Sequence, residues 1–170
     1  MKRLFAAILA LLLLAALPGC GNKNDPTTTG DKVPAPDFTV YNEKNEPVRL
    51  SDFHGKPVVL NFWASWYPPC KSEMPAFQQE FESVGDRVQF MMVNQTDGDR
   101  ETPITAAQFM AEQGYSFPVF FDFDYTASLA YGVRSIPVTF FIDAQGYVVA
   151  QATGAISHAQ LQQGIELLLS

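Results

Sequence analysis

The sequence predicts an α/β sandwich built on a mixed β-sheet, and two patterns carry that prediction. Apolar runs of strand length alternate along the chain with segments whose apolar residues recur at helical spacing. Near the end of the chain, the strand-like runs 138–142 and 147–150 are joined by a short turn, which predicts an antiparallel hairpin. Strands joined through helices pair in parallel, so the sheet should contain both kinds of pairing.

Each expected element is marked by its own residues. Residues 38–41 and 47–50 flank a polar turn and should form a short hairpin. Residues 57–63 are apolar almost without interruption, which is typical of a strand buried on both faces. Residues 70–84 carry apolar side chains at helical spacing and predict a helix. The later elements are a strand at 88–93, a helix from Thr102 to Gly114, a strand at 118–122, a short helix at 126–131, the hairpin just described, and a helix from Ser157 to Leu169.

The composition indicates one acidic globular domain. The chain has 170 residues, of which 47% are hydrophobic and 17% charged, so it is too short for two ordinary domains and too apolar to be wholly disordered. Its formal net charge is −7 and no basic block occurs, which argues against nucleic acid as a partner. Two cysteines are too few for a disulfide scaffold. No Cys/His cluster suggests a metal, and no motif suggests a cofactor.

The first twenty residues are expected to be a bacterial lipoprotein signal. Lys2 and Arg3 precede an apolar run at 4–17, which is shorter than the roughly 20 residues needed to span a bilayer. The run ends in Leu-Pro-Gly-Cys at 17–20, which resembles a lipobox. The resemblance implies that Cys20 is lipidated and holds the protein on the outer side of a membrane. The alternative is an ordinary signal peptide with Cys20 left free.

Residues 21–37 contain Gly, Pro, Thr and Asn without apolar periodicity, a composition typical of a mobile or polyproline-like tether. The sequence therefore predicts a signal peptide at 1–19, a lipidated tether at 20–37 and a folded domain at 38–170. This organisation places the protein in the bacterial cell envelope, and we expect it to be a monomer.

The most informative segment runs from Asn61 to Pro75. It predicts a buried strand, then Trp-Tyr-Pro-Pro-Cys at 66–70, then a helix. The free N–H groups and the dipole at a helix N-terminus stabilise a thiolate. The segment resembles the active-site stretch of the thioredoxin superfamily, and most of all that of its extracytoplasmic TlpA/ResA-like thiol–disulfide oxidoreductases.

Two further segments extend the resemblance. Residues 135–143 resemble the cis-proline loop of the family, which implies a cis Ile136–Pro137 bond facing the active site. Residues 98–122 resemble the helix and strand that TlpA-like proteins insert. The resemblance covers about residues 34–170. It implies a thioredoxin-like three-layer sandwich with an N-terminal β-hairpin, a central helix–strand insertion and a thiol–disulfide oxidoreductase ancestry.

The segment departs from the family at its most important position. The family pattern is Trp-Cys-x-x-Cys, and here Tyr67 stands in place of the first cysteine, so only Cys70 remains. Disulfide exchange needs one thiolate to attack and a second to resolve the mixed disulfide. A lipidated Cys20 is unavailable as the second thiol. Two-cysteine redox cycling is therefore predicted to be lost.

Several functions remain open. The chain is a degenerate thiol–disulfide oxidoreductase by resemblance, and Cys70 could still act as a monothiol. Alternatively, Cys70 is a small buried side chain without reactivity. The protein would then be a non-catalytic module that binds an extracytoplasmic protein or peptide, with or without a thiol or disulfide. Its groove would be formed by Trp66, Tyr67, Pro68, Pro69, Ile136 and Pro137.

The other polar residues are weaker candidates. Asn61 stands where many thioredoxins keep a buried acid, and an amide cannot titrate. Asp97 is the candidate for that acid, or else a loop carboxylate. We interpret Asp97, Asp99 and Glu101 as a solvated acidic loop rather than a calcium site, because their spacing fits no EF-hand. The same analysis assigns Asp122 and Asp124 to an outward polar face, His54 and His158 to the surface, Trp63 to the core and Trp66 to the rim of the site.

Overall fold

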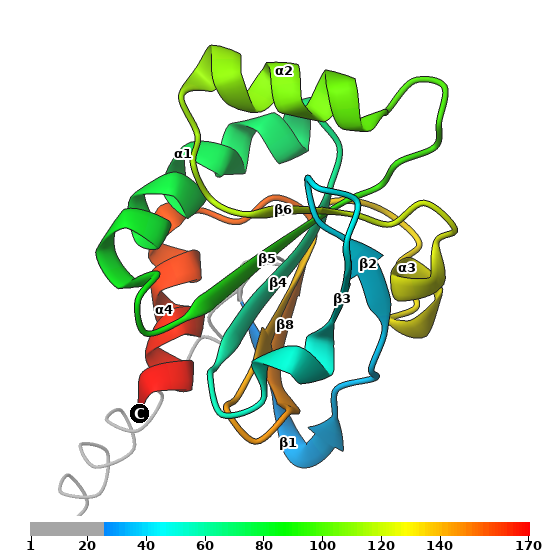
Figure 1. Cartoon of the computed structure of the whole chain (residues 1–170). Helices are drawn as coiled ribbons and strands as arrows, with labels where there is room; N and C mark the ends of the chain where they lie inside the picture. The colour runs from blue at the N-terminus through cyan, green and yellow to red at the C-terminus, as the bar shows by residue number, and fades with distance from the viewer. Residues whose placement is uncertain (1–25) are drawn as a thin grey trace, which may run out of the picture.

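The computed structural model describes residues 26–170, and the eight β-strands of this part form one mixed sheet (Figure 1). The order across the sheet is β1-β8-β7-β4-β5-β6-β2-β3. The strands are β1 (Thr27–Pro34), β2 (Thr39–Tyr41), β3 (Pro47–Arg49), β4 (Val58–Trp63), β5 (Gln89–Asn94), β6 (Val119–Phe121), β7 (Val138–Ile142) and β8 (Tyr147–Thr153). The helices are the 3₁₀ turn η1 (Leu50–Phe53), α1 (Pro68–Val84), α2 (Pro103–Gln113), α3 (Thr126–Ala130) and α4 (His158–Leu169).

The sheet combines parallel and antiparallel pairing, as predicted. Strand β5 lies between β4 and β6 and is parallel to both, whereas β7 is antiparallel to β4 and β8 is antiparallel to β7. All six residues of β4 are buried, which agrees with the unbroken apolar run in the sequence. Phe62 of β4 pairs with Val138 at the start of β7, and Trp63 pairs with Asn94 at the end of β5. The C-terminal end of β4 is therefore enclosed on both sides.

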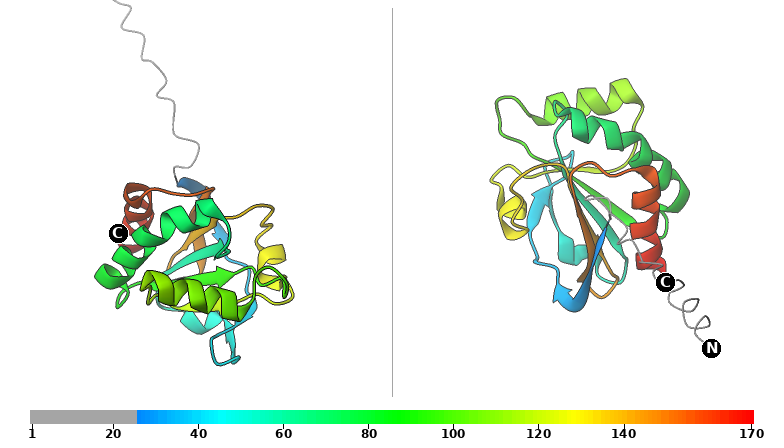
Figure 2. Two further views of the ribbon diagram at one scale, coloured as in Figure 1. Left: turned by 90° about the horizontal axis from the view of Figure 1, so that it is seen from above. Right: turned by 180° about the vertical axis from the view of Figure 1, so that it is seen from behind.

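A hydrophobic core lies on each face of the sheet. The sheet is thus the middle layer of a three-layer sandwich, and the elements that cover its two faces are the outer layers. Val59 and Trp63 of β4 pack with residues of α1, α2 and α4 in one core. Leu60 and Phe62, which point the other way, pack with residues of the β2–β3 hairpin and α3 in the second core. Figure 1 shows α1 and α4 on one side of the sheet and α3 on the other, and Figure 2 shows the same layers from above and from behind. The predicted three-layer α/β sandwich is thus confirmed.

The helix boundaries follow local signals in the sequence. The Thr102 hydroxyl accepts the Thr105 N–H at the start of α2, and Gly114, with φ of 71°, ends that helix. The Ser157 hydroxyl accepts the Gln160 N–H at the start of α4. Within 26–170 no helix is long and apolar enough to cross a bilayer.

The prediction that residues 20–37 form a tether is wrong for Thr27–Pro34, which form strand β1. This strand pairs antiparallel with β8, with an irregularity in register between Thr28 and Val33 (Figure 2). An edge strand needs only its backbone N–H and C=O groups to pair, so it requires no hydrophobic alternation that a sequence pattern would reveal. The predicted signal peptide at 1–19 and the lipidation site Cys20 lie outside the described residues.

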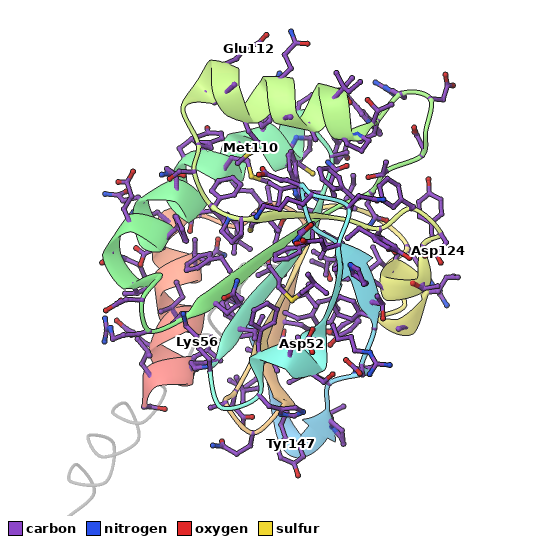
Figure 3. All side chains as sticks on the ribbon, in the orientation of Figure 1. Asp52, Lys56, Met110, Glu112, Asp124 and Tyr147 are labelled. Carbon is purple, nitrogen blue, oxygen red and sulfur yellow. The ribbon has the colours of Figure 1, made fainter. Side chains whose placement is uncertain are left out.

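The expectation of an outward polar face after β6 holds for Asp124 but not for Asp122. Asp124 is exposed, as Figure 3 also shows at the outer edge of the fold near α3. Asp122 is 1% exposed, and its carboxylate accepts the N–H groups of Ala127 and Ser128 at 3.2 and 2.9 Å. The first turn of α3 thus gains an acceptor for its free donors, which explains why a charged side chain is buried there.

A close contact between α4 and β7 gives a stability test. Gly164 lies so near the buried Phe141 that an added Cβ would stand 2.1 Å from the ring. We expect Gly164→Ala to lower the free energy of unfolding by about 1–3 kcal/mol through overpacking, although alanine has the better helix propensity. Urea unfolding measures the change, with Gln163→Ala on the exposed face of α4 as the control. An unchanged midpoint for Gly164→Ala would contradict the packing described.

Candidate functional site

The segment from Trp66 to Cys70 joins the central strand to the longest helix of the described chain. Strand β4 ends at Trp63, and α1 begins at Pro68 with Tyr67 as its N-cap. The two prolines fill the first two helical positions, where a missing N–H has no partner to lose. Cys70 is therefore the third residue of α1, as the motif predicts.

Burial governs the chemistry of Cys70. None of its surface is exposed, and it is a free thiol packed in the core between the sheet and α1. The pKa of the Cys70 thiol is raised from 9.0 to about 12, mainly by burial and to a smaller extent by the charges of Glu73 and Glu101, while a hydrogen bond from the Ala64 backbone lowers it. Desolvation thus outweighs the position at the helix N-terminus, and the thiol stays protonated at neutral pH.

Tyr67 occupies the position of the missing cysteine. Its backbone is extended, with φ of −90° and ψ of 117°, and its side chain makes no capping hydrogen bond. The ring is half-buried, packs against the core that contains Cys70, and meets Trp66 edge to face at 5.5 Å between centroids. An aromatic ring with a hydroxyl thus stands in place of a nucleophilic thiol.

The predicted cis-proline is present and lies beside this segment. The Ile136–Pro137 bond is cis. Phe62 pairs with Val138, and the two strands are antiparallel. Trp63 follows Phe62 and Pro137 precedes Val138, so Pro137 lies alongside Trp63, where the chain turns toward Tyr67. Ile136 is half-buried, and within residues 26–170 its backbone N–H and C=O make no hydrogen bond.

A buried carboxylic acid lies next to Asn61, but it comes from α1. Asn61 donates from Nδ2 to Glu73 Oε1 at 2.9 Å and to Thr139 Oγ1 at 3.0 Å. The other carboxylate oxygen of Glu73 accepts the Ile156 N–H at 3.0 Å. Burial raises the pKa of Glu73 from 4.5 to about 8, although both hydrogen bonds favour its charged form.

Glu73 was not among the residues predicted for the site, although the sequence carries a signal for it. Glu73 lies three residues after Cys70 and one before Met74, on the helix face that carries the apolar side chains. A charged residue at a position of that kind is expected to be buried with a partner.

Asp97 stabilises a loop instead of supplying this acid. Its carboxylate is exposed and accepts the N–H groups of Asp99 and Glu101, each at 2.8 Å. These hydrogen bonds hold the pKa of Asp97 below its usual value. The carboxylates whose charges act on Cys70 are those of Glu73 and Glu101, and Asp97 is not among them.

The interpretation of the acidic loop as solvated is wrong for Glu101. This side chain is 0% exposed. Its Oε1 accepts the Ser65 N–H at 3.0 Å and the Asn94 side-chain amide at 2.6 Å, and its Oε2 accepts the Ser65 hydroxyl at 2.8 Å. Glu101 therefore joins the loop that begins the insertion at 98–122, called the inserted loop below, to the segment that precedes Trp66.

The two tryptophans divide as predicted. Trp63 is 0% exposed and belongs to the core, whereas Trp66 is half-buried at the rim. The guanidinium carbon of Arg100 lies 3.6 Å from the centroid of a Trp66 ring. The inserted loop thus contacts the site through two consecutive residues, Arg100 and Glu101.

The described cavity lies elsewhere in the molecule. It has a volume of about 40 Å³, is partly open to solvent, and borders the first residue of β4 and the last of β7. His54 lines it, and His158 contacts the buried Glu80 at 2.5 Å, so neither histidine lies at the site. Across residues 26–170, no three His, Cys, Asp or Glu side chains are grouped to hold a metal ion.

The raised pKa of Glu73 predicts a pH-dependent stability. Between pH 4.5 and about 8 the unfolded chain releases this proton and the folded protein keeps it, so stability falls as the pH rises, by at most about 1.4 kcal/mol per pH unit. Below pH 4.5 the contribution is fully present. Glu73→Gln should remove this part of the slope in urea unfolding followed across that range. Glu82→Gln, on the exposed face of the same helix, is the control, and an unchanged slope in Glu73→Gln would refute the assignment.

Comparison with known proteins gives one consistent family. The model of the AhpC/TSA family matches residues 31–151. The thiol-disulfide oxidoreductase ResA of Bacillus subtilis (strain 168) is 33% identical over 135 residues, which are 79% of this chain and 73% of that protein.

Two solved structures extend the likeness to the fold. A thiol:disulfide interchange protein of the thioredoxin family from Chlorobium tepidum TLS superposes with a TM-score of 0.72 at 26% identity, covering 84% of this chain and 99% of that one. The pneumococcal exposed lipoprotein thioredoxin from Streptococcus pneumoniae strain TIGR4 gives 0.65 at 29% identity, covering 78% of this chain and 100% of that one. With its thioredoxin-like layers and cis-proline loop, this chain therefore belongs to the AhpC/TSA family, among the TlpA/ResA-like thiol–disulfide oxidoreductases.

Proposed function

We propose that this protein is a lipid-anchored, extracytoplasmic member of the family that has lost two-cysteine cycling and binds an extended segment of another protein. The groove would be formed by Trp66, Tyr67, Pro68, Pro69, Ile136 and Pro137. The observation that carries the proposal is the replacement of the nucleophile position by Tyr67 while the surviving Cys70 has no exposed surface.

The loss of cycling follows from the number of available thiols. In the dithiol reaction, a first thiolate breaks a substrate disulfide and forms a mixed disulfide, and a second thiolate then displaces the substrate as a thiol. Within residues 26–170 Cys70 is the single cysteine, so no internal disulfide can form at the site.

The burial of Cys70 also weighs against a monothiol role. A pKa of about 12 leaves about one thiol in 10⁵ ionised at pH 7. The thiolate is the nucleophile, and a side chain with no exposed surface offers it no access to peroxide or to a partner disulfide.

The cis-proline loop supports a binding role. The backbone N–H and C=O of Ile136 have no partner within residues 26–170, and an extended segment can pair with such groups as a strand pairs with a sheet edge. Trp66 and Tyr67, which we assign to the same groove, are half-buried and pack edge to face, so they would offer a partner an aromatic surface.

The start of β1 bears on the proposed anchor. Seven residue steps separate Cys20 from Thr27, the first residue of β1, and they reach at most about 25 Å. A lipid on Cys20 would therefore keep the domain close to the membrane surface. A partner in the groove would then be a secreted or membrane protein with a segment near that surface. The likeness to the pneumococcal exposed lipoprotein thioredoxin supports the anchor.

Thiol labelling of the folded protein tests the inert state of Cys70. We expect a maleimide to label the native protein at least about tenfold more slowly than the urea-unfolded protein, because the reagent needs an exposed thiolate. Cys20→Ser protein serves here, so that Cys70 is the one thiol measured. Rapid native labelling would favour the monothiol role.

Restoring the nucleophile tests the lost cycling. The unchanged protein should not reduce insulin disulfides, whereas Tyr67→Cys should do so with turnover and should form an internal disulfide with Cys70. Tyr67→Ser opens the same position without a thiol and should stay inactive. Turnover by the unchanged protein would overturn the proposed function. An inactive Tyr67→Cys would show that the loss of cycling does not lie in Tyr67 alone.

A further inference from the structure

The side chain of Arg100 lies over Trp66 at the rim of the proposed groove. Its guanidinium carbon is 3.6 Å from a Trp66 ring centroid, the distance of a cation stacked on an aromatic face. A stacked guanidinium uses its flat face for the ring, so the N–H groups in its plane remain free to donate.

The neighbouring residues hold this stack in place. Glu101, which follows Arg100, is 0% exposed and bonds both the N–H and the hydroxyl of Ser65, the residue that precedes Trp66. Glu101 also accepts the side-chain amide of Asn94 at the end of β5. The backbones on both sides of the stack are thus fixed to each other and to the sheet. With the Arg100 side chain also held against the Trp66 ring, little side-chain entropy remains to be lost when a ligand binds Arg100.

The guanidinium of Arg100 contacts no acidic side chain directly within the described part of the chain. Within residues 26–170 its side chain is exposed and makes no hydrogen bond or ion pair, and the ion pair found in this part of the chain joins His158 to Glu80. The charge of Arg100 helps to lower the pKa of the nearby Asp97, but the Asp97 carboxylate already accepts the backbone N–H groups of Asp99 and Glu101 and forms no direct ion pair with Arg100. A planar set of donors is therefore oriented at the groove rim without an acceptor.

We propose that Arg100 binds a carboxylate of the partner segment that lies in the groove. In that segment, the acidic side chain would stand next to the residues that contact Trp66 and Ile136. This inference rests on the proposed function. The protein has a formal net charge of −7, which disfavours acidic partners over most of its surface. Arg100 would therefore determine where along the segment the acidic side chain lies, through paired N–H···O contacts to one carboxylate.

A thiol-trapping assay with defined peptides tests this. The Cys20→Ser/Tyr67→Cys/Cys70→Ser variant carries a single thiol, at the groove, and the probes are acetylated, amidated heptapeptides with a central cysteine activated as a 2-pyridyl disulfide. The introduced thiolate attacks the peptide sulfur, forms a mixed disulfide and releases neutral pyridine-2-thione, whose absorbance gives the rate. Glu, Gln or Lys is placed in turn at each flanking position.

At one flanking position we expect Glu to react about two- to fivefold faster than Gln, with Lys slowest, as a solvent-exposed ion pair allows. The Glu/Gln ratio should fall to one with Arg100→Gln and in about 1 M salt, and it should partly return with Arg100→Lys. Arg87→Gln is the matched control, because Arg87 is exposed beyond the C-terminal end of α1. Ratios within one variant cancel any effect of Arg100 on the thiol itself.

The outcomes separate the two proposals. Peptides that react faster than the 2-pyridyl disulfide of N-acetylcysteinamide, but equally for Glu, Gln and Lys, would overturn the role of Arg100 and leave the groove standing. Peptides that react no faster than this small disulfide would overturn both. A preference for the free-acid peptide over its amide, with no Glu/Gln difference, would assign Arg100 to a terminal carboxylate and contradict an acidic side chain.

Discussion

The site depends on the packing of the first turn of α1 against the end of β4. Strand β4 is buried along its whole length, and Cys70 at the start of α1 joins the same core as Val59 and Trp63. The start of a helix is favourable for a thiolate, but this one has no contact with water to stabilise the charge. The desolvation of Cys70 therefore decides its chemistry, and the less buried position at the site belongs to Tyr67, which has no thiol.

Two buried acidic side chains, Glu73 and Glu101, lie beside this turn and connect it to neighbouring segments. Glu73 connects α1 to β4 through Asn61 and to the segment before α4 through the backbone of Ile156. Glu101 connects the inserted loop to Ser65. Each carboxylate accepts at least two hydrogen bonds, which compensates in part for its loss of water. These hydrogen bonds fix the segments that carry the residues of the proposed groove, which agrees with the binding role that we propose.

Much of the fold was predictable because its signals are local. The buried strand at 57–63, the Thr102 and Ser157 caps and the end of α2 at Gly114 each depend on residues close together in the chain, and all are confirmed. The buried carboxylates were not predictable in this way. Glu73 bonds Ile156, which is 83 residues away, and Glu101 bonds Ser65 across 36 residues. A carboxylate is buried only where the fold brings donors to it, and no pattern around the residue reports on such partners. Strand β1 was missed for a related reason, since backbone pairing at an edge leaves no side-chain pattern.

The sequence by itself determined the order of strands and α-helices after β1, the family, and the absence of a first cysteine before Pro68-Pro69-Cys70, because each of these is a property of residue type and spacing. The tertiary structure alone decided that Cys70 is enclosed, that the buried acid next to Asn61 is Glu73, and that Arg100 stacks on Trp66. Those facts depend on how α1, β5 and the inserted loop meet at one end of the sheet. Burial and hydrogen-bond partners there come from segments that are distant in the chain and adjacent only after folding.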